Sequence, residues 1–144
     1  METTMTPYNF RRVVGYSILA ALMVLLLTGC GLFPARFDGQ EHAMIVNVHV
    51  ISQDDAVCNT RDSAYLAAQT MYQDARWAWT YGRDLPDNGP MIRMTENLMA
   101  MTRELDDRYK KGDPVSTAYC RLKFKNIHTA TDTILKVSAR RPRL

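Results

Sequence analysis

The segment from Val13 to Cys30 constrains the fold of this chain more than any other segment. It is too apolar to lie on the surface of a small water-soluble domain. It reads VVGYSILAALMVLLLTGC and directly follows the paired Arg11 and Arg12. A short basic segment, an apolar run of about 15 residues and small residues at its end are typical of a secretory signal peptide. The sequence therefore predicts that residues 1–29 direct export and that the folded domain follows them.

The end of this run, Leu27-Thr28-Gly29-Cys30, resembles the lipobox of bacterial-type lipoproteins, which both bacteria and phages encode. The resemblance covers residues 11–31. It implies cleavage before Cys30, transfer of lipid to the Cys30 thiol, and acylation of the new amino terminus. In such lipoproteins an aspartate after the cysteine favours the inner membrane, and here that residue is Gly31. We therefore expect a lipid anchor in the outer membrane, with the domain facing the periplasm.

The alternative is an uncleaved membrane anchor. The mostly apolar run extends from Val13 to Phe33, which is close to the roughly 20 residues that span a bilayer. Arg11 and Arg12 would then hold the amino terminus in the cytoplasm. Under this alternative the protein sits in the inner membrane, and its domain still faces outward.

Removal of residues 1–29 leaves 115 residues, enough for one small domain. We expect residues 30–42 to be a tether and residues 43–144 to be the domain. The charge changes sign along the chain: residues 37–112 contain eight Lys or Arg and twelve Asp or Glu, whereas residues 113–144 contain seven and two. The two parts either neutralise each other in the fold or leave a basic end that binds an anionic surface.

Two cysteines remain once Cys30 is assigned to the lipid. Cys58 and Cys120 are an even number in an exported domain, and exported compartments are oxidising. The sequence therefore predicts a Cys58–Cys120 disulfide. Two buried free thiols are the alternative.

Apolar residues at helical spacing predict three helices. The first runs from Ser52 to Tyr81 after a capping signal at residues 52–55, and the second begins at Pro90 and ends near Gly112. The third begins at Pro114 after an Asp113 cap and continues to about residue 137. We expect a mainly α fold, a small antiparallel three-helix bundle. In it the first and third helices run parallel and the disulfide joins their first turns.

Residues 44–51 alternate β-branched and polar side chains, which is typical of a strand. We expect them to form an extended segment that precedes the three helices. An alternative is an α+β fold in which residues 44–51 pair with residues 119–125. Leu122 to Phe124 fit both a helical and a strand period, although the longer stripe up to Val137 favours a helix.

The sequence contains no phosphate-binding glycine loop, nucleophile elbow or HExxH motif. Glu41, His42 and His49 match no known metal-ligand spacing, and the acidic residues from Glu104 to Asp107 indicate a solvated face. We therefore expect no enzymatic activity, no cofactor, no metal and no nucleic-acid partner.

Two groups of residues remain as predicted binding residues. Trp77 and Trp79 are two residues apart on a helix, so at least one ring leaves the core, and we expect Trp77, Tyr81 and Arg76 to form an exposed patch. We expect a protein-interaction module in the cell envelope. In phages, small lipoproteins of this build are linked with superinfection exclusion or lysis. The alternative is a structural linker whose basic C-terminal helix binds anionic polymer or lipid through Lys136, Arg140, Arg141 and Arg143.

Overall fold

The computed structural model describes residues 35–143. The predicted signal peptide, the lipobox at Leu27, Thr28 and Gly29, and the lipidation site Cys30 lie outside these residues. Within residues 35–143, no helix is both long enough and apolar enough to span a bilayer.

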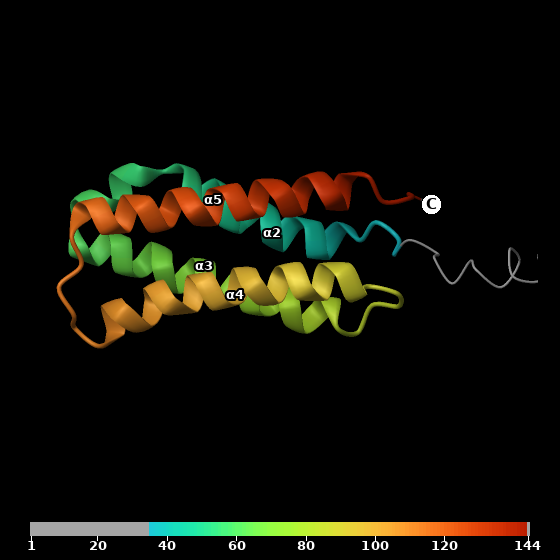
Figure 1. The fold of residues 1–144 in the computed structure, drawn as a ribbon, viewed down its shortest axis with the longest axis horizontal. Helices are drawn as coiled ribbons and strands as arrows, with labels where there is room; N and C mark the ends of the chain where they lie inside the picture. Colours follow the sequence, from blue (N-terminus) through green and yellow to red (C-terminus); the bar gives the residue numbers. More distant parts are fainter. Residues whose placement is uncertain (1–34, 144) are drawn as a thin grey trace, which may run out of the picture. The chain divides into compact units, whose positions relative to one another are not determined.

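The described residues are mainly helical, as predicted, but they form four long helices instead of three. In chain order the elements are α2 (Gly39–Gln53), the 3₁₀ helix η1 (Asp55–Asn59), α3 (Arg61–Gly82), α4 (Gly89–Lys110) and α5 (Thr117–Ala139). Helices α2 and α4 each pack against both α3 and α5, and consecutive helices run antiparallel (Figure 1). This arrangement is an up-down-up-down bundle, in which α3 and α5 run parallel.

Helix α2 occupies the segment that we expected to be extended, so that prediction is wrong. Asp38 caps this helix, because its carboxylate accepts hydrogen bonds from the backbone N–H groups of Gln40 and Glu41. Its buried face is Glu41, Ile45, Val48 and Ser52, a helical spacing that the alternating valines concealed. Packing against α3 and α5 thus overrides the β propensity of the segment.

Two further predictions fail at the same elements. The α+β alternative is wrong, because residues 119–125 lie within α5 and the residues described contain no strand. The predicted tether is too long, because residues 39–42 form the first turn of α2 and Glu41 is completely buried. The packed domain therefore begins before residue 43.

Helix boundaries were predicted unevenly. Pro90 lies in the first turn of α4, and Gly112 after α4 has a φ of 78°, so the predicted boundaries of this helix are confirmed. The other two starts differ: Thr60 caps α3 through the Ser63 N–H, and Ser116 caps α5 through the Tyr119 N–H. The predicted start at Ser52 lies in the last turn of α2, nine residues before α3 begins at Arg61, and the predicted start at Pro114 lies three residues before α5 begins at Thr117.

The core of the bundle is lined by one stripe from each helix. On α4 this stripe includes two threonines in place of two of the methionines at helical spacing. Met94 and Met101 are only half-buried, while Thr95 and Thr102 are completely buried. Each threonine hydroxyl donates back to a carbonyl one turn earlier, at Met91 or Leu98, and this satisfies its polar group inside the core. The core-facing positions of α4 are Met91, Thr95, Leu98, Thr102, Leu105 and Tyr109.

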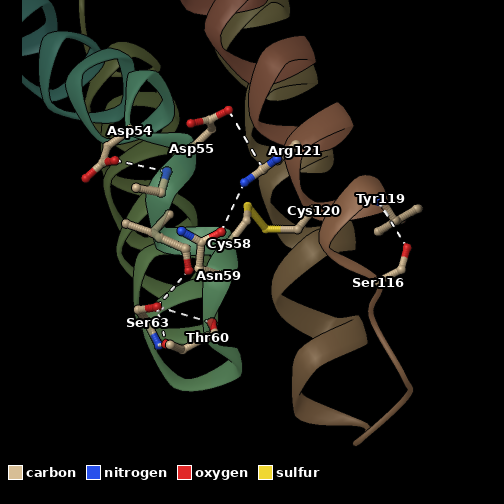
Figure 2. The surroundings of a disulfide bond; sticks show 12 residues. Asp54, Asp55, Cys58, Asn59, Thr60, Ser63, Ser116, Tyr119, Cys120 and Arg121 are labelled. Carbon is tan, nitrogen blue, oxygen red and sulfur yellow. Dashed lines mark hydrogen bonds and ion pairs between the residues drawn. A yellow bond between two sulfur atoms is a disulfide. The ribbon is translucent and has the colours of Figure 1, made fainter.

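The predicted disulfide is present between Cys58 and Cys120, whose Cα atoms lie 5.8 Å apart. Figure 2 shows that it joins η1 to the first turn of α5. Cys58 therefore lies in the short helix before α3 and not in the first turn of α3. Next to the bond, Arg121 donates to the Asn59 side chain at 3.0 Å. The disulfide closes the end of the bundle where α3 and α5 both begin.

Candidate functional site

The outward face of α3 carries the most conspicuous exposed apolar side chains of the domain. Leu66 and Trp77 expose 63% and 64% of their surface, although both lie in the middle of a packed helix. The core is contacted instead by a separate stripe that includes Ala68, Met71 and Ala75. We call the outward positions at alternating spacings of four and three residues the α3 stripe: Leu66, Thr70, Gln73, Trp77 and Thr80.

A hollow lies on this face of α3. Its volume is about 410 Å³, and Gln73, Arg76, Trp77 and Thr80 line it. Three of these residues belong to the α3 stripe, and Arg76 supplies the only charged group among them. The hollow thus combines a large aromatic ring, two neutral hydrogen-bonding side chains and one guanidinium group. These are features of sites where a protein side chain is buried on binding.

The structure separates Tyr81 from the predicted aromatic patch. Its hydroxyl donates to the Asp38 carboxylate at 3.2 Å, which links α3 to the start of α2. Burial and the negative charge of Asp38 raise the pKa of Tyr81. Trp79 is also half-buried, and the Arg83 guanidinium lies 4.9 Å from its ring centre. Of the predicted aromatic patch, only Trp77 and Arg76 line one surface.

The predicted basic residues of the C-terminal helix fall into two groups. Lys136, Arg140 and Arg143 are exposed, and Lys136 forms an ion pair with Asp132 at 2.6 Å. Arg141 is different, because its side chain is only 7% exposed and it forms an ion pair with Glu41 at 2.9 Å. The prediction that Arg141 binds an external polyanion is therefore wrong, since its guanidinium is used inside the fold.

A buried polar cluster surrounds Arg141. Its guanidinium donates to Glu41 Oε2 and to Asn88 Oδ1, and the Asn88 amide nitrogen donates to Glu41 Oε1 at 2.8 Å. The same amide nitrogen donates to the Gly82 carbonyl at 2.8 Å. These contacts tie together α2, the connection between α3 and α4, and the segment after α5. We call Glu41, Asn88 and Arg141 the end cluster.

Gly82 leaves space for the end cluster. A Cβ atom at this position would lie 2.7 Å from Glu41 Oε1 and 3.0 Å from the Asn88 amide nitrogen. A side chain there would therefore collide with the cluster. The only sequence signal for Gly82 was its position directly after the predicted end of the first helix at Tyr81, and that signal could not reveal contacts with Glu41.

His49 and His128 stack between α2 and α5, with their ring centres 4.3 Å apart. The Thr131 hydroxyl donates to the His128 carbonyl, so it accepts from His49 Nδ1–H at 3.0 Å. The Gln53 amide then donates to the free His49 Nε2 at 3.3 Å, which fixes the neutral tautomer. Burial and the neighbouring His128 both lower the pKa of His49, and Asp132 opposes this effect.

These histidines do not form a metal centre with their neighbours. Within residues 35–143, no group of three His, Cys, Asp or Glu side chains is arranged to hold a metal ion. Glu41, His42 and His49 have separate roles: Glu41 belongs to the end cluster, and the imidazoles of His42 and His49 contact α5 through Ser138 and Thr131.

The acidic residues near the end of α4 are paired with cations. Lys123 binds both oxygens of Glu104 at 2.7 Å, and this contact lowers the pKa of Glu104. Asp106 is completely buried and its Oδ2 accepts from Lys110 at 2.6 Å. Each of the two carboxylates is therefore held as the partner of a lysine, and the complete burial of Asp106 shows that the solvated face predicted for residues 104–107 is wrong at this position.

The α3 stripe and the hollow beside Trp77 are therefore the best candidate site among the described residues. Trp77 and Arg76 were predicted from their residue types, whereas Leu66, Gln73 and Thr80 were missed. The 4-3-4-3 spacing was the signal that could have revealed them, but it became visible only once the core face of α3 was known. The chain matches no protein-family model, no curated protein and no solved structure.

Proposed function

We propose that this protein is a lipid-anchored interaction module of the cell envelope and that a partner protein binds it through the α3 stripe. The exposed Trp77, set in a hollow with Arg76 and Gln73, is the observation that carries the proposal. Tryptophan and arginine are enriched among the residues that dominate binding energy, and a solvent-exposed tryptophan contributes little to the stability of a monomer.

The spacing of the α3 stripe specifies the kind of partner. Positions that alternate by four and three residues form a straight seam along a helix, which is the geometry that a second helix packs against. Among the five stripe residues none is charged, so the partner helix should present neutral and apolar side chains. Arg76 beside the stripe favours one acidic residue on the partner.

The lipid anchor is the second part of the proposal and depends on the lipobox-like residues 27–30. A mature protein that begins at Cys30 and carries acyl chains, placed in the outer membrane and facing the periplasm, would support it. Mass spectrometry of membrane-purified protein tests this directly. Recovery of the chain with Met1 intact would instead favour the uncleaved inner-membrane anchor.

Photo-crosslinking in intact cells tests the binding surface. A photoreactive residue at Gln73 should yield one dominant protein adduct, whereas the same residue at Thr129, on the exposed side of α5, should yield none. Trp77→Ala should weaken partner binding by at least about 30-fold, the equivalent of a hot spot of about 2 kcal/mol. Its melting temperature should change little, because the ring lies outside the core.

Leu122→Ala is the matched control, because Leu122 is an exposed apolar residue on α5, with 56% of its surface accessible. It should leave both adduct formation and binding unchanged. Equal loss in the Trp77 and Leu122 variants would indicate nonspecific hydrophobic capture and contradict the proposal. A phage role in superinfection exclusion or lysis becomes the favoured interpretation only if the captured partner is a phage receptor or a lysis protein.

A further inference from the structure

The two ends of the domain meet and bring three arginines onto one surface. The Phe37 N–H donates to the Pro142 carbonyl at 3.0 Å, and Arg141 donates to the Arg36 carbonyl at 3.3 Å. These contacts bring the segment before α2 against the segment after α5. Arg36, Arg140 and Arg143 are all exposed there, and we call these three residues the arginine end.

The charge of the arginine end is not cancelled by neighbouring acids. Within residues 35–143, none of its three residues takes part in an ion pair. Glu41 is nearby in the fold, but its carboxylate is buried and paired with Arg141. Asp38 keeps its negative charge while one oxygen caps α2 and the other accepts from the Tyr81 hydroxyl, but the three exposed arginines outnumber this carboxylate.

The surface is also amphipathic. The Arg143 guanidinium lies 4.8 Å from the centre of the Phe37 ring, which holds it in place. A hollow of about 260 Å³ adjoins Arg140, and its other lining residues include Ala35, Pro90 and Val137. Arginine beside aromatic and aliphatic groups is the combination that suits the boundary between lipid head groups and acyl chains.

We propose that the arginine end binds the anionic phospholipid head groups of the membrane that carries the anchor. The inference rests on the proposed lipidation of Cys30. Only four residues separate Cys30 from Ala35, and even a fully extended chain joins these two Cα atoms over no more than about 18 Å. The arginine end is the end of the bundle at which α2 begins and α5 ends (Figure 1). A lipid anchor at Cys30 would therefore confine this end to the membrane surface.

This surface differs from the basic C-terminal helix expected from the sequence. Arg141 is buried in an ion pair with Glu41, and Lys136 forms an ion pair with Asp132. Arg36, from the segment before α2, lies beside the segment after α5 and adds a third exposed arginine. The acids of the same end of the bundle, Asp84 and Asp87, lie in the connection between α3 and α4. Figure 1 shows that connection on the other side of this end from the segment after α5. Head groups should therefore contact the α2–α5 side first.

Arginine footprinting of the lipidated protein in vesicles tests the inference. The full mature protein is reconstituted either in vesicles of zwitterionic lipid or in vesicles containing about one third phosphatidylglycerol. It is then treated with an arginine-modifying reagent and analysed by mass spectrometry. In anionic vesicles the modification rates of Arg36, Arg140 and Arg143 should fall at least about threefold, and about 0.5 M salt should restore them. Arg76 and Arg103 serve as internal references and should not change.

A double variant provides the second readout. Arg140→Gln with Arg143→Gln should abolish the protection of Arg36 in anionic vesicles. The matched control, Arg103→Gln with Lys111→Gln at the other end of the bundle, should preserve it. Equal rates in the two kinds of vesicle, equal protection in both, or protection only after addition of cell-wall polymer would each overturn the inference. If the protein fails to co-sediment with vesicles, both the arginine-end proposal and the proposed anchor are refuted. The proposed binding surface on the α3 stripe is independent of this result, because the Trp77 and Leu122 variants test it.

Discussion

The end cluster provides the sharpest test of this structure, because the sequence and the fold assign opposite roles to Arg141. As one residue of a basic tail, Arg141 would be equivalent to Arg140 and Arg143. Among residues 35–143 its guanidinium is the only cation paired with the completely buried carboxylate of Glu41, at 2.9 Å. Arg141→Ala would leave that carboxylate with the Asn88 amide as its remaining side-chain partner.

The expected cost follows from this geometry. Removing one partner of a buried ion pair typically costs about 3–5 kcal/mol, because the remaining charge stays desolvated. For a domain of about 110 residues, about 1 kcal/mol corresponds to about 4 °C, so the melting temperature should fall by about 12–20 °C. Arg140→Ala removes an exposed neighbour and should change stability by no more than about 0.5 kcal/mol.

Thermal unfolding followed by circular dichroism measures both variants, and a third variant tests the mechanism. Glu41→Gln combined with Arg141→Met removes both charges, so it should be more stable than Arg141→Ala despite containing one more substitution. Equal melting temperatures for Arg141→Ala and Arg140→Ala would refute the end cluster. A double variant less stable than Arg141→Ala would show that the loss does not come from the uncompensated carboxylate.

Three further predictions concern other parts of the bundle. Cys58→Ser should lower the unfolding free energy by about 4 kcal/mol, the chain-entropy value for a loop of about 60 residues, and should leave Cys120 reactive toward a thiol probe; unchanged stability would contradict it. The unfolding free energy should decrease as the pH falls from about 7.5 to 5.5. In the fold the pKa of His49 is lowered from its ordinary value of 6.5, so the unfolded chain binds more protons than the folded chain in this range. His49→Asn should make the unfolding free energy less dependent on pH. Gly82→Ala should destabilise the domain by more than about 1 kcal/mol although alanine favours helices, because its Cβ collides with Glu41; a stabilised variant would contradict the packing of the end cluster.

Local sequence signals predicted α4, the C-terminal part of α3 and the body of α5. In these segments apolar residues repeat at helical spacing between a proline or polar start and a glycine or proline stop. They failed for α2, where valines at every second position imitate a strand. The true buried positions Ile45 and Val48 are three residues apart, but they are recognisable only once α3 and α5 are in place. Tertiary packing therefore decided the element that local propensity assigned wrongly.

For the predicted site residues as well, local signals succeeded and contacts between distant segments could not be predicted. Trp77 was predicted to be exposed because it and Trp79 point to different sides of one helix, and this reasoning needs only the helical period. Arg141 was misassigned because its partners, Glu41 and Asn88, are 100 and 53 residues away in the sequence. Glu41 itself was placed in a tether, where nothing would have required it to be buried. Contacts between distant segments are therefore what the sequence could not supply.

The segment before α2 and the segment after α5 contact each other through Phe37 and Pro142. This contact determines where a label can be attached to the protein. An affinity tag or fluorescent protein fused to the carboxyl end would emerge beside the amino-terminal segment and crowd the arginine end. The connection between α4 and α5 around Gly112 is exposed and lies at the opposite end of the bundle (Figure 1). It is the better position for an inserted label.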